Sequence, residues 1–260
     1  MNKLNPATQL SPPRIADASG VALSIHHLEF VGLTAQAIGD WRARRAPLGM
    51  TPGQYRAFCE ELFTAATQDN IPDLDLRIKG SAAGIFSCLH KTLPVNRVDL
   101  AVAYLGAFKA QPQTTEQDQM DAQREKLWAL QPYPRQRPFD SMFKLGADPL
   151  PSDYDIQLSS NEIANRCTVE YSSRPRYSSY PEKFPLVHPE YGYLLSPLVT
   201  LIIPSIKDWA DRWTKILYRD VNVKAFSASG PPNVTLKVGE LSSHHRASDW
   251  MIDRPIPGVD

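Results

Sequence analysis

The sequence predicts an α/β protein of the α+β type, in which a short mixed sheet is flanked by helices. Segments rich in alternating or β-branched residues predict its strands at residues 73–80, 153–159 and 220–226. Amphipathic segments at residues 50–70 and 205–219 predict long helices. We expect the helices to cover one side of the sheet and a functional site to lie at its open edge.

The first half of the chain favours helices. Residues 28–49 have helical spacing of apolar side chains and end in basic residues, including the run 42–45. In the helix predicted at residues 50–70, Thr51 suits the N-cap and Pro52 the first turn. Its predicted buried face consists of Tyr55, Phe58, Leu62 and Phe63.

The segment between the first two predicted strands is long and mostly helical. Residues 81–93 are predicted to form a helix directly after the first strand. Residues 98–110 fit a strand or a helix, and residues 114–130 predict a polar helix that faces solvent. A proline-rich connector follows at residues 131–140. We therefore expect a large helical insertion at about residues 95–145.

The second half of the chain alternates between strands, helices and loops. Ser160 is a suitable cap for a helix at residues 160–167. Residues 171–190, rich in Ser, Pro, Tyr and Arg, predict a loop. A turn is expected at residues 227–233, and residues 234–241 favour another strand.

Domain boundaries follow from polarity. Residues 1–18 are polar, contain proline and lack the apolar core of a signal peptide, so we expect a flexible N-terminal arm. Residues 19–260 then form a single domain. The apolar stretch at residues 193–206 is interrupted by Pro197 and Pro204 and is too short to span a bilayer.

Composition limits the class of partner. The chain has 260 residues, of which 42% are hydrophobic and 22% are charged, as in ordinary globular proteins. Its formal net charge is zero, so no overall field would gather a long nucleic acid, and we expect neither DNA nor a membrane as partner. Cys59, Cys88 and Cys167 show no disulfide or zinc spacing, which indicates a reducing, cytoplasmic location.

Asp153 and Asp155 are the main candidate functional residues. Side chains alternate along a strand, so both carboxylates point to the same face. Two neighbouring carboxylates repel each other unless a cation lies between them, and hard ions such as Mg²⁺ prefer these oxygen ligands. The pair therefore predicts a site for Mg²⁺ or Mn²⁺, with substrate phosphates completing the coordination shell.

Gly80 and Ser81 are the second candidate element. Glycine lets the backbone approach a phosphate closely, and the N–H groups at a helix start face such an anion. The Ser81 hydroxyl adds a donor. Lys91 and Lys144 are candidates to neutralise a bound triphosphate, although lysines in such positions commonly face solvent.

The order KGSAAGIFS, then SDYDIQLS, then a later strand that starts with an aspartate, resembles the DNA polymerase β-like nucleotidyltransferase superfamily. The resemblance covers roughly residues 70–230. It implies that Gly80 and Ser81 bind phosphate and that Asp153 and Asp155 bind the metal. Asp220 is then the third carboxylate, which helps bind the metal and activates the attacking hydroxyl.

The resemblance implies the nucleotidyltransferase fold and a reaction. An NTP would donate its NMP to a hydroxyl of a nucleotide, a tRNA or a protein, and pyrophosphate would leave. The chain departs from the family in having about seventy residues between Ser81 and Asp153. If the strand register places Asn222 beside the acid pair, we expect an impaired metal site and a non-catalytic protein that binds a nucleotide or a partner.

Other polar motifs carry weaker signals. Asp73 and Asp75 form another Asp-x-Asp pair but precede the Gly-Ser element, so we expect them only to begin a strand. Arg174 and Arg176 are expected at the surface. Adjacent histidines such as His244 and His245 point in different directions and seldom bind one metal. An unrelated α/β interaction module whose motifs are coincidental is the remaining alternative; separation of Ser81 from Asp153 in space would favour it.

Overall fold

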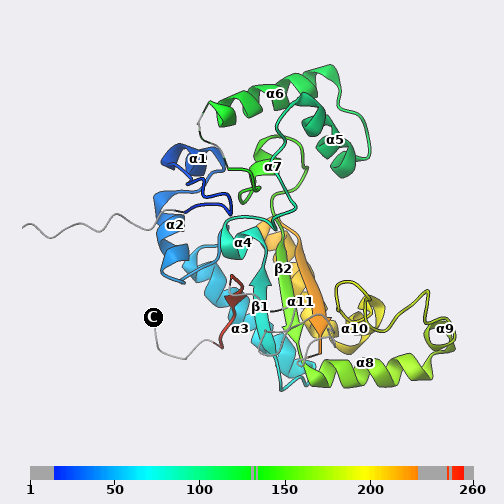
Figure 1. The fold of residues 1–260 in the computed structure, drawn as a ribbon. Coiled ribbons are helices and arrows are strands. Elements are labelled where there is room, and N and C mark those ends of the chain that lie inside the picture. The colour runs from blue at the N-terminus through cyan, green and yellow to red at the C-terminus, as the bar shows by residue number, and fades with distance from the viewer. Residues whose placement is uncertain (1–14, 130–131, 133, 228–244, 246–247, 255–260) are drawn as a thin grey trace, which may run out of the picture.

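The computed structural model describes residues 15–129, 132, 134–227, 245 and 248–254, which form eleven helices and a four-stranded mixed sheet (Figure 1). The predicted α+β arrangement, a mixed sheet flanked by helices, is confirmed. The strands are β1 (Asp75–Lys79), β2 (Tyr154–Ser159), β3 (Val221–Phe226) and β4 (Trp250–Met251). The helices are α1 (Ile25–Phe30), α2 (Ala35–Arg42), α3 (Pro52–Gln68), α4 (Ser81–Gly84), α5 (Arg97–Phe108), α6 (Thr114–Trp128), α7 (Ser141–Lys144), α8 (Asn161–Ser173), α9 (Pro175–Ser178), α10 (Ser196–Ile202) and α11 (Pro204–Leu217).

The strand order β3-β2-β1-β4 determines which chain segments meet. Strands β1 and β2 are antiparallel, with Lys79 opposite Asp155, whereas β2 and β3 are parallel, with Asp155 opposite Asn222. The C-terminal end of β1 therefore lies beside the N-terminal ends of β2 and β3. Three segments that are distant in the sequence converge at this end of the sheet.

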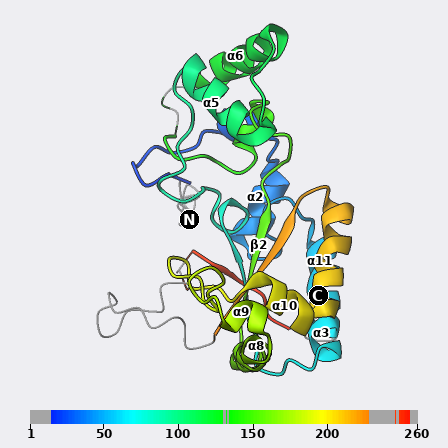
Figure 2. The same ribbon diagram turned by 90° about the vertical axis from the view of Figure 1, so that its right-hand side faces the viewer.

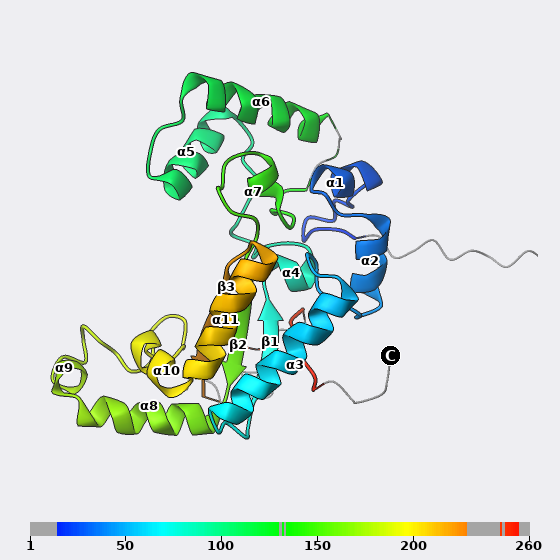
Figure 3. The ribbon, with the colours of Figure 1, turned by 180° about the vertical axis from the view of Figure 1, so that it is seen from behind.

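Helices α3 and α11 pack against one another behind the sheet (Figure 3). Phe58 of α3 lies at the centre of this layer, with its ring centroid 4.5 Å from that of Trp209 and 5.3 Å from that of Trp213. The Trp209 Nε1–H donates to the Phe58 carbonyl at 3.1 Å, so the buried indole nitrogen has a partner. Phe58, Trp209 and Trp213 of the two predicted helices thus form one aromatic core.

Two predicted helices are shorter than expected. Residues 28–49 contain the end of α1, which begins at Ile25, and all of α2; the two are separate because Gly32 takes a φ of +76° and Thr34 then caps the second helix. The helix predicted at residues 81–93 ends at Gly84, one turn after it begins. Ile85 has a φ of +70°, and the chain then leaves the helix to form bridges with residues 136 and 138.

Elsewhere the predicted elements agree more closely with the structure. Thr51 caps α3 in a capping box with Pro52 in the first turn, and Ser160 caps α8. Residues 98–110 belong largely to α5, which resolves the choice between strand and helix. The loop predicted at residues 171–190 contains the end of α8 and the short α9, and β4 was not predicted. The turn at 227–233, apart from residue 227, and the strand at 234–241 lie outside the described residues.

Helices α5 and α6 form a separate lobe beyond the end of the sheet (Figures 1 and 2). Both helices fall within the predicted insertion at residues 95–145, and the lobe has a small apolar core to which flanking residues also contribute. That core consists of Leu93, Leu100, Tyr104, Met120, Leu127, Leu145 and Ala147. Because α6 contributes the buried Met120 and Leu127, this helix is only partly solvent-facing.

The ends of the domain are also partly described. Of the expected arm, residues 1–14 lie outside the described residues, while Ala16 bridges to Ala22 and the Asp17 side chain accepts from the Arg135 N–H at 2.7 Å. The apolar stretch at 193–206 contains α10, which buries Leu198 against the core, and the start of α11. Within the described ranges, no helix is both long and apolar enough to cross a bilayer.

Asp69 should be important for the pairing of α3 with α11. Its buried carboxylate, at the end of α3, accepts hydrogen bonds from the N–H groups of Ser205 (3.0 Å) and Ile206 (2.9 Å) at the start of α11. We expect Asp69→Ala to lower the free energy of unfolding by about 1–3 kcal/mol, because two backbone donors lose their acceptor. Urea denaturation measures this change. The exposed Asp211→Ala variant is the control and should lose under about 1 kcal/mol; similar losses in both variants would contradict a capping role.

Candidate functional site

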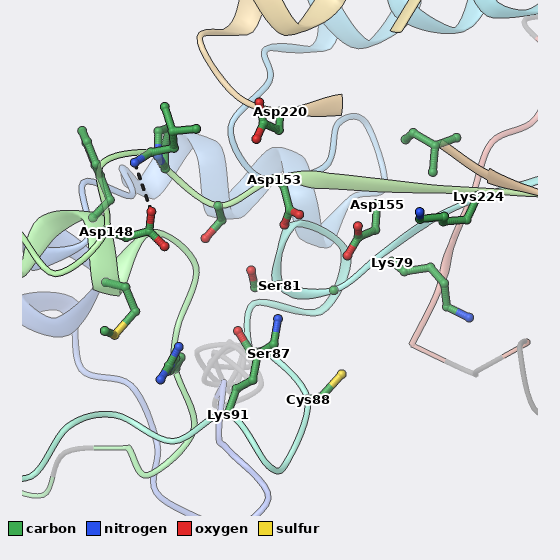
Figure 4. Close-up of a pocket in the computed structure, with 18 of the residues that line it drawn as sticks. Lys79, Ser81, Ser87, Cys88, Lys91, Asp148, Asp153, Asp155, Asp220 and Lys224 are labelled. Atoms are coloured by element: carbon green, nitrogen blue, oxygen red, sulfur yellow. Dashed lines mark hydrogen bonds between the residues drawn. The ribbon is translucent and has the colours of Figure 1, made fainter. Parts of the chain in front are cut away.

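A cavity of about 520 Å³ opens at the convergent end of the sheet (Figure 4). Its walls come from the ends of β1, β2 and β3, the segment after α4, and the chain that returns from the helical lobe. The predicted site residues that line it are Gly80, Ser81, Lys91, Asp153, Asp155 and Asp220. Lys144 is not among its described lining residues; it lies on α7, with Nζ close to Gly32.

The acid pair is fixed by the residue between its members. Tyr154 is fully buried, and its hydroxyl donates to the Leu48 carbonyl at 2.6 Å. Because side chains alternate along a strand, Asp153 and Asp155 are then directed to the opposite face, into the cavity. Figure 4 shows both carboxylates pointing toward the turn that contains Ser81.

The Gly-Ser turn lies directly beside this pair. Gly80 has a φ of +77°, and a Cβ atom at this position would lie 3.8 Å from Asp155 Oδ2. The turn is held from behind, since Leu48 N donates to the Ala82 carbonyl at 3.0 Å and Trp41 Nε1 donates to the Ala83 carbonyl at 2.7 Å. Ser81, expected from the sequence to lie near Asp153 and Asp155, is thus brought to them by the β1–β2 pairing.

The electrostatics of the pair favour a cation. Burial and the neighbouring Asp153 charge raise the pKa of Asp155 to about 6, although Lys91, Lys224 and Lys79 act in the opposite direction. Even with these lysines nearby, ionising Asp155 beside the negative charge of Asp153 therefore costs free energy. A bound cation between the carboxylates would relieve this repulsion.

Asp220, the predicted third acid, does not form a closed metal-binding group with Asp153 and Asp155. Asp220 precedes β3 and lines the cavity, and its carbonyl accepts from the Tyr154 N–H at 2.8 Å. The side chain in contact with the pair, however, is that of Asn222, whose Nδ2 donates to Asp153 Oδ2 at 2.9 Å. Over the described part of the chain, no three His, Cys, Asp or Glu side chains are gathered in a group able to hold a metal ion.

The residues present still fit a magnesium-type ion. Mg²⁺ is usually held by one or two carboxylates, with waters and substrate phosphates as its remaining ligands. Asp153 and Asp155 supply this minimum, and the adjacent Gly-Ser turn is where such phosphates would lie. Such a donor set would suit an ion shared with a bound phosphate better than a closed structural metal centre.

An ion pair outside the predicted motifs holds the strand ends together. Arg219 donates to both carboxylate oxygens of Asp140 at 2.7 Å and to the Ser152 carbonyl at 3.0 Å. The Asp140 carboxylate also accepts from the Ser152 N–H at 2.8 Å. Ser152 precedes Asp153 and Arg219 precedes Asp220, so the pair fixes both acidic residues through their neighbours. A lone Arg or Asp in the sequence gives no signal for this role.

Several other polar motifs have structural partners. Asp73 accepts from the Ser160 hydroxyl and from the Asn161 N–H, and Asp75 pairs with Arg77. The arginines of the predicted basic run and loop also have partners. Arg45 pairs with Asp40, and Arg174 pairs with Glu170. The Arg176 guanidinium lies over the Tyr177 ring. His245 lies 3.4 Å from the Ser159 hydroxyl, while His244 is outside the described residues.

Comparison with known proteins gives no match: no protein-family model, no curated protein and no solved structure is recognisably similar to the chain. The functional assignment therefore depends on the residues and geometry of the cavity itself.

The raised pKa of Asp155 should make stability depend on pH. Its folded-state pKa of about 6 exceeds the ordinary value of 3.8, so the folded protein binds this proton more tightly than the unfolded chain. The free energy of unfolding should rise as pH falls from about 7 toward about 4. Asp155→Asn should stabilise the metal-free protein by about 2–3 kcal/mol at about pH 8 and change little near pH 4.

Urea denaturation in EDTA across this pH range tests the dependence on Asp155. The exposed Asp118→Asn variant on α6 is the control and should leave the pH profile unchanged. A profile of Asp155→Asn parallel to that of the unsubstituted protein would show that this carboxyl has an ordinary pKa.

The Asp140–Arg219 pair should be essential for stability. Both side chains are largely buried, at 8% and 13% exposure, so Arg219→Met leaves an uncompensated buried carboxylate. We expect a loss of about 3–5 kcal/mol in the free energy of unfolding. The double variant Asp140→Asn/Arg219→Met should lose less than the sum of the single variants, which a double-mutant cycle by urea denaturation measures. Additive losses would argue against direct coupling.

Proposed function

We propose that the protein is a metal-dependent nucleotidyltransferase with a polymerase β-like catalytic fold. The observation that carries this proposal is the adjacency of Gly80–Ser81 and Asp153–Asp155 at one end of the sheet. A phosphate-binding turn beside a pair of carboxylates is the combination that nucleotidyl transfer from an NTP requires. The mixed sheet and the large helical insertion between the two motifs are compatible with this fold.

The chain's own residues have distinct roles in this proposal. Asp153 and Asp155 would hold Mg²⁺ or Mn²⁺, which when bound supplies Lewis-acid stabilisation of the transferring phosphoryl group. The backbone at Gly80 leaves room for the β- and γ-phosphates, and the Ser81 hydroxyl donates to them. Lys91, across the cavity from the acid pair in Figure 4, offsets part of the phosphate charge.

The proposed reaction is an in-line displacement at the α-phosphorus. An acceptor hydroxyl oxygen forms a new bond to the α-phosphorus while the bond from that phosphorus to the bridging oxygen breaks. Pyrophosphate leaves with the bonding electrons, and the Asp220 carboxylate orients the hydroxyl and accepts its proton. The acceptor is a hydroxyl of a nucleotide, a tRNA or a protein, and we place the reaction in the cytoplasm.

A second candidate function is nucleotide binding without catalysis on the same fold. The hydrogen bond from Asn222 to Asp153 favours it, since an amide occupies the position beside the acid pair where a third carboxylate would strengthen metal binding. In this alternative the protein would hold a nucleotide to recognise it or to recruit a partner. Asp220, at the edge of the pair, would then have no role in proton transfer.

Pyrophosphate release separates the two functions. With Mg²⁺ or Mn²⁺, each NTP and candidate acceptors including tRNA, we expect turnover that falls at least about 100-fold in Asp153→Asn and in Asp155→Asn. The matched control is Asp75→Asn, in the chain's other Asp-x-Asp pair at the far end of β1, and it should retain turnover. Equal turnover in Asp155→Asn would eliminate the proposed mechanism.

The variant Asn222→Asp also distinguishes a transferase from a protein that only binds nucleotides. If the protein only binds nucleotides, the unsubstituted chain releases no pyrophosphate, and the added carboxylate is expected to create metal-dependent release. If the protein is a transferase, the unsubstituted chain is already active and Asp220→Asn lowers its turnover.

A further inference from the structure

Two tyrosine rings, backed by a histidine ring, form part of a cavity wall that the proposed reaction does not use. Tyr191 and Tyr193 line the cavity, and their rings are nearly parallel, with an interplanar angle of 9° and centroids 6.2 Å apart. The His188 ring contacts both, with centroid distances of 4.7 and 4.6 Å. We call these three residues the aromatic turn.

The backbone of the aromatic turn holds its rings in place. His188 N donates to the Tyr193 carbonyl at 2.8 Å, and Gly192, with a φ of +73°, donates to the His188 carbonyl at 2.9 Å. His188 Nδ1 accepts from the N–H groups of Glu190 at 3.2 Å and Tyr191 at 3.1 Å. The rings are therefore positioned before any ligand arrives, which lowers the entropy cost of stacking on them.

Tyr191, the most exposed ring of the aromatic turn, is accessible to a ligand in the cavity. Tyr191 is 59% exposed although it lies on the wall of a cavity. An exposed aromatic face next to polar side chains is typical of a site that takes a planar ligand. The hydroxyls of tyrosine side chains can remain in water while their ring faces stack.

Lys224 connects the aromatic turn to the acid pair. Its Nζ lies 4.8 Å from the centroid of the Tyr193 ring, and its charge acts on Asp155. Lys224 belongs to β3, on the opposite side of β2 from Gly80, and β1 and β3, the two neighbours of β2, are separated by roughly 10 Å. A ligand that crosses Asp153 and Asp155 therefore has a phosphate-binding turn at one end and aromatic rings at the other.

We propose that the aromatic turn is the stacking platform for the base of the nucleotide whose phosphates lie at Gly80–Ser81. This inference rests on the proposed function for the position of the phosphates. Stacking on an aromatic face accepts any base, so the platform adds affinity for nucleotides over plain phosphate chains without selecting one base strictly. Purines, with the larger ring face, should bind more tightly than pyrimidines.

Calorimetric titration with MgATP and with magnesium tripolyphosphate tests the platform. Tyr191→Ala should raise the Kd for ATP by about 10- to 100-fold and leave the Kd for tripolyphosphate unchanged. Tyr191→Trp should restore ATP binding, since it replaces one stacking ring by another. The control is Tyr180→Ala, which removes a tyrosine of similar exposure, 56%, that is not a lining residue of the cavity.

The outcomes separate this inference from the proposed function. The platform is wrong if Tyr191→Ala leaves ATP binding intact, if it weakens both ligands equally, or if the unsubstituted protein binds tripolyphosphate as tightly as ATP. Failure of the unsubstituted protein to bind either ligand removes the platform and the transferase together. ATP binding that depends on Tyr191 without pyrophosphate release supports the platform and removes only the transferase.

Discussion

The ion pair between Asp140 and Arg219 is the interaction on which the candidate site depends. It joins the chain returning from the helical lobe to the residues just before β2 and just before β3. Phe139 lies under the guanidinium, with its ring centroid 4.7 Å from Arg219 Cζ. A buried pair of this kind contributes little net stability compared with apolar residues, but its hydrogen bonds tie Asp140, Ser152 and Arg219 to one another. This arrangement sets Asp153 next to Asp220.

The rest of the scaffold supplies rigidity around this pair. Tyr154 anchors β2 to the segment before α3 through the Leu48 carbonyl, and the same segment binds the Gly-Ser turn through Leu48 N. Leu48 thus contacts both halves of the site through its own backbone N–H and C=O groups. Asp69 joins α3 to α11, and the aromatic core between those helices supports the sheet from behind. The site lies where these fixed elements end, and its remaining walls are loops.

Local motifs could be predicted from the sequence, whereas contacts between distant segments could not. The caps at Thr51 and Ser160 and the strand at Asp153–Asp155 follow from nearest-neighbour chemistry, so they were predictable. The prediction of a helix at 81–93 was wrong, because Ile85, a buried core residue, takes a φ of +70° that ends the helix after one turn. Strand β4 is two residues long and is defined by its pairing with β1, which leaves no pattern in the sequence. The same reason applies to Asp140 and Arg219, which are far apart in the chain, and to the aromatic turn, which forms locally but lines the cavity only because of the fold.

The charges of the cavity indicate what kind of ligand it favours. Four basic side chains (Lys79, Lys91, Arg137 and Lys224) and four acidic ones (Asp148, Asp153, Asp155 and Asp220) line it. They are not evenly mixed, because Asp153 and Asp155 form a pair at the start of β2, with Asp220 just before β3, while Lys91 lies across the cavity (Figure 4). A bare polyphosphate is repelled by the acids, and a bare divalent ion is opposed by the lysines. An ion-bound triphosphate presents positive charge to the acids and negative charge to the lysines at the same time, so its two parts bind more strongly together than either does alone.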